Sequence, residues 1–210
     1  MDIVSDLAQT VVDSAVSAAT ETVINKCFEY VEMYFPQLEV KRNIHFLEVC
    51  EKTSKELIRR GYAPENCRKI MDKRGLVFIP IACVESEPTL QELLAQLLAN
   101  AMDPKHDENQ VHVAFIECVK TMTRDDAMIL KFCAEKGGSR FNKAEARSRA
   151  GLKDDIERFE IALGNLKRLQ IITTMKNSVS LEIVEDIEID DSQHFSLTSF
   201  GKAFIEASRP

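Results

Sequence analysis

The feature that most constrains the fold is a leucine-rich segment, residues 89–102, whose apolar residues recur at helical spacing. They form one wide stripe: Leu90, Leu93, Leu94, Leu97, Leu98, Ala101 and Met102. Such a stripe is typical of a helix that buries one side against other helices. Thr89 and Glu92 predict a capping box at its start, and Pro104 predicts its end because proline cannot continue a helix. The segment therefore predicts a helix at the centre of a helical core.

Two further helices are predicted directly after it. A polar loop, residues 105–110, leads to a segment whose apolar residues are Val111, Phe115, Cys118, Val119 and Met122. Thr123 and Asp126 then have the spacing of a second capping box, followed by the apolar body 127–133. Three helices joined by short connections make a core but contain no pattern of catalytic residues.

The N-terminal residues 2–34 contain no glycine or proline and predict one long amphipathic helix. Its apolar stripe is flanked by small residues in 14–19, which let a second helix approach closely. We expect this helix to join the core or to form a homo-oligomer through residues 2–34. A membrane role is disfavoured, because the first twenty residues hold three aspartates and no lysine or arginine.

Between these regions the pattern predicts a helix over 38–60 that ends at Gly61, and a short helix over 65–73 that ends at Gly75. The apolar run 76–81 contains Pro80, which argues against a central strand. This run is expected to be a buried connector or the start of a helix.

After Cys133 the pattern changes from helical to mixed. Asn142 and Glu145 predict the start of a short helix over 143–150, and apolar residues at helical spacing predict a helix over 154–169: Ile156, Phe159, Leu163, Leu166 and Leu169. Segments rich in β-forming residues follow at 171–175, 179–184 and 194–197, and Thr198 is placed to cap a last helix ending at Ala207. This order is typical of a winged helix-turn-helix.

The predicted fold class is thus mostly α, with an N-terminal helical bundle over 1–122 and a winged-helix-like domain with a small β-hairpin wing over 123–210. Six basic residues are candidates for binding nucleic acid or a partner: Arg147, Arg149, Lys153, Arg158, Lys167 and Arg168. Negative charge disfavours DNA binding, because it repels the phosphates. Four acidic residues lie at the start of the helix 154–169, six lie in 179–191, and the net charge is −7. A protein partner is therefore favoured over DNA.

Catalytic and metal-binding patterns are absent from the sequence. It contains no nucleophile elbow, phosphate-binding glycine loop or zinc-protease motif, so we expect no enzyme activity and no cofactor. The polar loop holds the only cluster of metal-type ligands, Asp103, His106, Asp107, Glu108 and His112, without fixed helical spacing. A solvated turn is favoured there.

The six cysteines are at least fifteen positions apart, which excludes a C-x-x-C pair. With no signal peptide or spanning segment, we expect reduced cysteines in a cytoplasmic protein. Cys118 or Cys133 with His112 could form a nucleophile and its base, but apolar surroundings favour inert thiols.

Four sequence patterns resemble the Abi-alpha family, bacterial proteins associated with abortive infection of phage-infected cells. Three of them are a leucine-rich helix ending in Ala101-Met102-Asp103, the element His112-Val113-Ala114-Phe115, and a capped helix beginning at Met122-Thr123. The family's closing pattern L-T-x-F-G-x-x-F is matched by Leu197, Thr198, Phe200, Gly201 and Phe204.

The chain departs from the family at two positions. Val113 stands where the family's H-P-x-F element has proline, and the family's G-L-I turn is replaced by Leu169-Gln170-Ile171. The resemblance implies a non-enzymatic interaction protein of phage defence that acts through protein contacts. A winged-helix transcriptional regulator or DNA sensor is the alternative.

Overall fold

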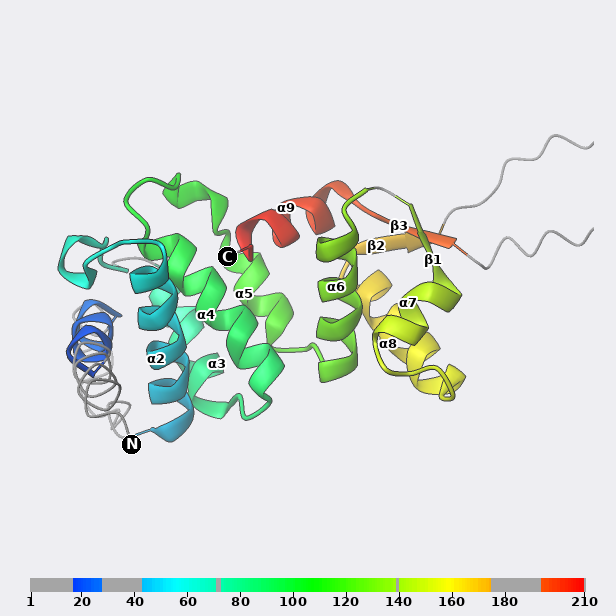
Figure 1. Cartoon of the computed structure of the whole chain (residues 1–210), viewed down its shortest axis with the longest axis horizontal. Helices are drawn as coiled ribbons and strands as arrows, with labels where there is room; N and C mark the ends of the chain where they lie inside the picture. The colour runs from blue at the N-terminus through cyan, green and yellow to red at the C-terminus, as the bar shows by residue number, and fades with distance from the viewer. Residues whose placement is uncertain (1–16, 28–42, 71–72, 139, 175–193, 210) are drawn as a thin grey trace, which may run out of the picture. The chain divides into compact units, whose positions relative to one another are not determined.

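The computed structural model describes residues 17–27, 43–70, 73–138, 140–174 and 194–209. The chain is mostly helical and has a small three-stranded antiparallel sheet near its C-terminus, in agreement with the predicted mostly α class (Figure 1). Its contacts divide it into two compact units, Met1–Thr121 with Ala207–Pro210, and Met122–Glu206. Each unit is described separately below.

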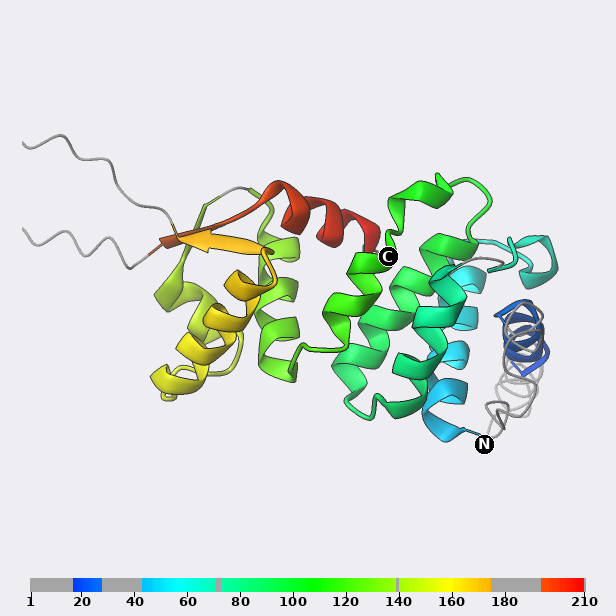
Figure 2. The ribbon, with the colours of Figure 1, turned by 180° about the vertical axis from the view of Figure 1, so that it is seen from behind.

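The first unit contains a helix over 17–27, α2 (Ile44–Arg59), α3 (Lys73–Val84), α4 (Pro88–Met102) and α5 (Val113–Val119). Two short 3-10 helices, Pro64–Asn66 and Glu108–Gln110, lie in its connections. α2 and α4 lie side by side, as Figures 1 and 2 show from opposite directions. Most of the predicted leucine stripe of α4 is buried in this core: Leu90, Leu94, Leu97, Leu98, Ala101 and Met102.

The predicted capping box at Thr89 is wrong. The N-cap lies two residues earlier, at Glu87, whose carboxylate accepts the backbone N–H of Thr89 at 3.4 Å, and α4 begins at Pro88. Proline suits the first helical position because its missing N–H would have no partner there and its φ is already helical. The predicted end is confirmed, since α4 stops at Met102.

The residues 73–84 form a helix throughout, so the predicted helix over 65–73 with an end at Gly75 is wrong. Gly75 is buried inside α3, and Pro80 lies within the same helix with its ring exposed. Proline removes the hydrogen bond to the carbonyl four residues earlier, which costs about 3 kcal/mol in an isolated helix. Burial of Phe78, Ile79 and Ala82 offsets that cost.

The helix predicted over 38–60 is observed as α2 from Ile44, while 38–42 lie outside the described residues. Asn43 caps α2 and accepts the backbone N–H of Phe46 at 3.0 Å. At the other end Gly61 adopts a φ of 80° that terminates the helix, as predicted.

The second unit begins with α6 (Arg124–Lys136), and the capping box predicted there is confirmed. The Asp126 carboxylate accepts the Thr123 backbone N–H at 2.6 Å, and the Thr123 hydroxyl accepts that of Asp126 at 3.4 Å. α7 (Lys143–Arg149) and α8 (Ile156–Arg168) follow, and both pack against α6. Asn142 caps α7 by accepting the Glu145 N–H, also as predicted.

The sheet consists of β1 (Arg140–Asn142), β2 (Ile172–Thr174) and β3 (His194–Leu197) in the order β1-β3-β2, and α9 (Ser199–Ala207) follows it. β1 was not predicted, because three residues are too few to show alternation. Its Phe141 pairs with Phe195 of β3, and the two rings stack 5.5 Å apart inside the unit. The predicted strand 179–184 lies outside the described residues.

Candidate functional site

The closing pattern of the sequence, from Leu197 to Phe204, contacts the turn that follows α8. The Thr198 backbone N–H donates to the Ile171 carbonyl at 3.0 Å, and the Thr198 hydroxyl accepts the Gly201 N–H at 2.9 Å. The Gly201 backbone lies against that same carbonyl, so that a Cβ there would be 2.0 Å from the Ile171 oxygen. The backbone contact between α9 and the α8–β2 turn therefore requires threonine at position 198 and glycine at position 201.

The turn after α8 is a Schellman motif whose left-handed residue is Gln170. The Ile171 N–H donates to the Leu166 carbonyl, and the Gln170 N–H donates to the Lys167 carbonyl. Gln170 has a φ of 58°, whereas Leu169, the C-cap of α8, has a φ of −74°. Gln170 therefore occupies the left-handed position that glycine usually takes in such a turn.

Gln170→Gly is expected to raise the free energy of unfolding by about 1 kcal/mol, because left-handed backbone strains a residue with a Cβ. The turns of the same type after α2 and α7 have glycine at the left-handed position, Gly61 and Gly151. Leu169→Gly is the matched control and should not stabilise, since the φ of Leu169 is −74° and glycine relieves no strain there. Urea denaturation followed by circular dichroism measures both. A stabilising Leu169→Gly would contradict this register.

The element His112-Val113-Ala114-Phe115 is the N-terminus of α5. His112 is the N-cap, and its Nδ1 accepts the Ala114 backbone N–H at 3.1 Å. The His112 ring also meets the buried Phe115 ring edge-on at 6.2 Å. Val113 is the first helical residue, which is the position where a helix accommodates proline best. The motif is therefore a helix cap, and the chain keeps its geometry without the proline.

Val113→Pro is expected to fold normally and to gain about 0.4–1 kcal/mol of stability, because proline restricts the unfolded chain. His112 already has φ −76° and ψ 144°, the extended conformation that a residue before proline prefers. Ala114→Pro is the control: it removes the N–H that His112 accepts, and it should lower the thermal midpoint. Equal effects of the two substitutions would contradict the assignment of Val113 to the first position.

The exposed side of α8 carries hydrophobic as well as charged side chains. Ile156 and Ile161 are 59% and 64% exposed, although the sequence placed Ile156 on the buried stripe. Gly164 lies on the same side, and a Cβ there would meet nothing within 4 Å. We call the following residues the α8 face: Ile156, Glu157, Glu160, Ile161, Gly164, Lys167 and Arg168. The sequence signal for this surface was an isoleucine, Ile161, outside the buried periodicity of its helix.

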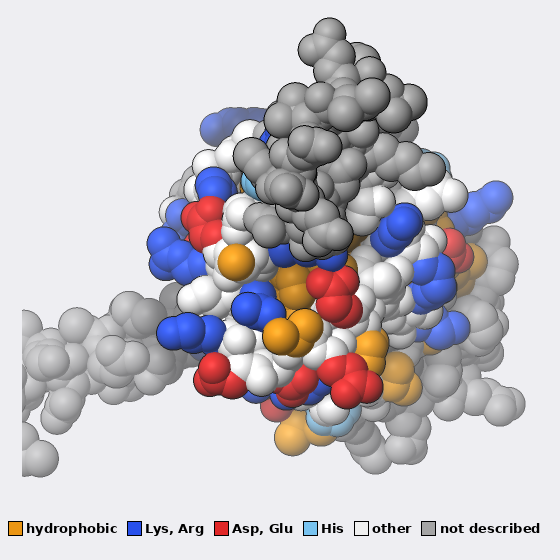
Figure 3. Space-filling view, turned by 90° about the vertical axis from the view of Figure 1, so that its right-hand side faces the viewer, with side chains coloured by type: hydrophobic (Ala, Val, Ile, Leu, Met, Phe, Trp, Pro, Cys, Tyr) orange, Lys and Arg blue, Asp and Glu red, His pale blue; other side chains and the backbone are white. Residues whose placement is uncertain are grey.

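The six predicted basic residues differ in their surroundings. Arg147 is half-buried in α7, Arg149 and Lys153 are exposed, and Lys167 and Arg168 lie in the last turn of α8. Arg158 is engaged within the unit, because its guanidinium donates to both oxygens of Asp125 at 2.7–3.1 Å. Figure 3 shows basic, acidic and hydrophobic side chains interspersed on one face, with no continuous basic surface among the described residues drawn there.

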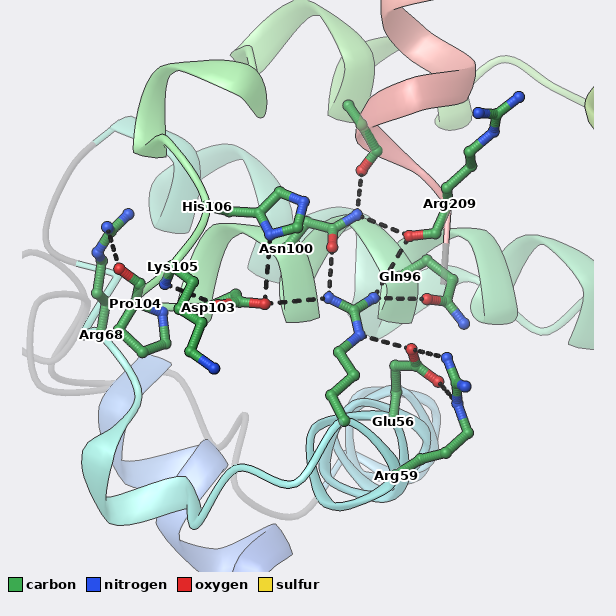
Figure 4. Close-up of polar contacts among 12 residues, drawn as sticks. Glu56, Arg59, Arg68, Gln96, Asn100, Asp103, Pro104, Lys105, His106 and Arg209 are labelled. Carbon is green, nitrogen blue, oxygen red and sulfur yellow. Dashed lines mark hydrogen bonds and ion pairs between the residues drawn. The ribbon is translucent and has the colours of Figure 1, made fainter.

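Charged side chains are buried in the first unit around Arg60, whose side chain is only 11% exposed. Arg60 Nε donates to Glu56 at 2.6 Å, Nη1 donates to Asn100 at 2.5 Å, and Asp103 lies 3.6 Å away. Asn100 in turn donates to the carbonyls of Ala207 and Arg209, which belong to the same unit (Figure 4). We call Glu56, Arg60, Asn100 and Asp103 the Arg60 cluster.

Both carboxylates of the Arg60 cluster are stabilised in their ionised form. Burial by itself would raise the pKa of Glu56, but hydrogen bonds from Arg59 and Arg60 lower it below its ordinary value. Burial opposes ionisation of Asp103 too, but its pKa is lowered by the Lys105 backbone N–H and the Tyr62 hydroxyl. The cluster holds ionised groups together and has the character of a structural ion pair.

The loop residues considered as metal ligands have separate roles. Asp103 is buried in the Arg60 cluster with His106 Nδ1 3.3 Å from its carboxylate, whereas His112 caps α5. Among the residues that the structure describes, no group of three or more histidine, cysteine or acidic side chains is placed to hold a metal ion.

All six cysteines are free thiols, and five of them are buried. Burial raises the pKa of the Cys133 thiol to about 12, so the reactive thiolate is disfavoured. Cys118 is only 8% exposed, and His112 uses its Nδ1 as a helix cap. This geometry does not support Cys118 or Cys133 as a nucleophile with His112 as its base.

The described part of the N-terminal helix, 17–27, packs within the first unit. Ala19, Val23 and Cys27 of the predicted stripe are buried, and the Thr20 hydroxyl hydrogen-bonds to Ser54 of α2 at 2.8 Å. Self-association through residues 2–34 remains a prediction, and 2–16 and 28–34 lie outside the described residues. Across the described ranges, no helix has the length and apolarity that crossing a bilayer requires.

A comparison with protein-family models matches residues 48–208 to the family described as Abortive infection alpha. The match begins within α2 and includes the His112 cap, the α8 face and the Thr198–Gly201 contact. Searches of curated proteins and of solved structures found no match.

Proposed function

Since the chain belongs to the abortive infection alpha family, we propose that it acts in bacterial phage defence through protein contacts and without catalysis. Membership in the family suggests the defence role. The exposed hydrophobic side chains of α8 support a contact with another protein. The cytoplasm, where phage replicates, is the proposed place of action. The proposal assigns the contact to the α8 face.

The second unit is proposed to be a winged helix. Three helices, α6, α7 and α8, are followed by β2 and β3, and β1 lies between α6 and α7. The sheet order β1-β3-β2, with both pairings antiparallel, supports this assignment. In such a unit α8 corresponds to the recognition helix, the element that presents side chains to a binding partner.

One observation carries the choice of a protein partner, namely the composition of the α8 face. Ile156 and Ile161 are the two large hydrophobic side chains exposed on α8, and Glu157 and Glu160 lie beside them. Exposed isoleucines gain free energy when a protein covers them, whereas carboxylates repel a phosphate backbone. The face therefore suits a protein and opposes DNA.

Protection of cells against phage tests this function. Cells that express the chain should plaque at least one phage of a broad panel less efficiently than cells with an empty vector. Ile161→Glu should abolish that difference, because a buried glutamate opposes the contact, while the exposed position leaves the fold intact. Lys202→Glu on α9 is the control for surface charge and should keep protection. Equal plaquing with and without the gene would overturn the defence role.

The second candidate, a DNA-binding regulator or sensor, is favoured by four exposed basic residues: Arg149, Lys153, Lys167 and Arg168. Fluorescence anisotropy with mixed-sequence duplex DNA distinguishes it. We expect no binding even at low salt, because the acidic residues of α8 oppose the phosphates. Binding that falls steeply with salt, and that Arg149→Glu with Lys153→Glu removes, would replace the protein-contact proposal by this candidate.

A further inference from the structure

Four residues of α8 form a straight stripe whose chemistry is self-complementary. Glu157, Ile161, Gly164 and Arg168 follow one another at spacings of four, three and four residues, so they project along one line of the helix. Glu157 lies at the N-terminal end of the stripe and Arg168 at its C-terminal end. Between them lie Ile161, which has a large side chain, and Gly164, which has none.

An antiparallel copy of the same stripe matches it at every position. When the twofold axis is level with the peptide between Ala162 and Leu163, Glu157 faces Arg168 of the second copy. Ile161 then faces Gly164 of that copy. A glycine lets two helix backbones approach closely, and the open space around Gly164 can receive the isoleucine. Opposite charges meet at both ends of the contact.

The charge of Glu160 and the position of the Arg168 side chain are compatible with this pairing. Glu160 is held by Lys143 of its own chain, with Nζ at 3.0 Å and 3.1 Å from its oxygens, so its charge is partly compensated. The Arg168 guanidinium reaches Asn165 of its own helix through Nε and Nη2, and this contact directs the side chain along α8. In this register Ile156, at one end of the α8 face, lies at the same height along the helix as Leu169 of the second copy.

We infer that two copies of this chain dimerise through antiparallel packing of their α8 faces. The inference rests on the proposed function, because it names a second copy as the protein that covers the same face. A closed twofold contact uses one patch twice, which is the commonest symmetry of soluble oligomers. One helix per subunit gives a contact smaller than a standard interface, so we expect a weak dimer with a dissociation constant of roughly micromolar order.

Sedimentation velocity of the full chain at tens of micromolar tests the dimer. The unchanged protein should sediment as a dimer, and Gly164→Gln should sediment as a monomer because the new side chain fills the place of Ile161. Gly164→Gln should also raise thermal stability, since glutamine favours a helix interior, so loss of the dimer cannot be due to unfolding. A monomeric full chain, or a dimer that Gly164→Gln leaves intact, would overturn the inference.

Charge reversal tests the antiparallel register. Glu157→Lys and Arg168→Glu should each weaken the dimer about tenfold, because each places like charges together at both ends of the contact. An equimolar mixture of the two variants should dimerise again, since lysine then faces glutamate and Arg168 faces Glu157. Lys202→Glu should leave the mass unchanged. Singly weakened variants that the mixture does not restore would overturn the antiparallel arrangement.

The phage assay separates this inference from the proposed function. If the full chain is monomeric while Ile161→Glu still abolishes protection, the dimer is refuted and the contact with another protein stands. If the chain dimerises through α8 while Gly164→Gln keeps full protection, the dimer stands and the proposed role of the α8 face in defence is refuted.

Discussion

Gly201→Ala is expected to cost the Met122–Glu206 unit at least about 3 kcal/mol of stability and to leave much of the protein aggregated. A Cβ at Gly201 would lie 2.0 Å from the Ile171 carbonyl oxygen and 2.8 Å from its carbon. Both are backbone atoms, and the same oxygen accepts the Thr198 N–H. Neither α9 nor the α8–β2 turn can therefore move without losing that hydrogen bond.

Gly164→Ala is the matched control in the same unit. Its Cβ would meet nothing within 4 Å, and alanine favours a helix interior over glycine by about 1 kcal/mol. The two glycine substitutions should thus change stability in opposite directions. Urea denaturation together with the soluble yield measures both. If Gly201→Ala folded with unchanged stability, the close approach of α9 to Ile171 would be wrong.

Arg60→Met is expected to lower the stability of the first unit by about 3 kcal/mol, because it removes the buried cation that lies between Glu56 and Asp103. The substitution keeps the length of the side chain but removes the donors to Glu56 and Asn100 and the charge beside Asp103. The Glu56 and Asp103 side chains are only 8% and 4% exposed, so water cannot replace the guanidinium.

Arg59→Met is the matched control, since Arg59 makes two hydrogen bonds of 2.7 Å to the same Glu56. The Arg59 side chain is 61% exposed, and ion pairs in contact with water contribute less than about 1 kcal/mol. Chemical denaturation should therefore distinguish two neighbouring arginines with the same partner. Equal losses would show that burial of the cluster does not determine its contribution.

The effect of Arg60→Met should depend on pH. The folded chain lowers the pKa values of Glu56 and Asp103, so their contribution to stability is complete above the ordinary carboxyl pKa of about 4. It is lost as the pH falls through the lowered values, because the folded carboxylates then take up protons. The stability difference between the wild type and Arg60→Met should accordingly shrink in acid. A constant difference across that range would contradict the ion pair.

The opposite pH dependence is expected from Asp126. Burial raises the pKa of this carboxyl above its ordinary value, although hydrogen bonds from Thr123 and Asn165 oppose the shift. Its contribution is therefore complete in acid and decreases as the pH rises through the raised value. Comparing Arg60→Met with the wild type at each pH cancels this contribution, since Asp126 is present in both proteins.

Helices with strong local signals were predictable from the sequence. The Thr123 and Asp126 capping box lies within one turn, and the leucine stripe of α4 repeats for four turns, so both patterns are readable without the fold. The start of α4 and the extent of α3 were mispredicted, because proline and glycine were interpreted as breakers, although the start of a helix was one of two expectations for 76–81. Burial of the α3 side chains outweighed that local preference, and burial depends on neighbours distant in sequence.

The candidate site was predictable only in part. The resemblance identified the family from its motifs, and the match over residues 48–208 confirms it. The exposure of Ile156 and the engagement of Arg158 by Asp125 could not be predicted, because each depends on how α8 is rotated against α6.

By itself the sequence determined the mostly helical class, the two capping sites at Thr123 and Asn142, and the family. These properties depend on residues within a few positions of one another, where hydrogen bonds and periodicity are local. The tertiary structure alone decided why Gly201 must be glycine, why Arg60 is buried with Asp103, and which side of α8 is exposed. Each of these is set by an atom from another element, 30 or more residues away in the chain, whose position follows from packing.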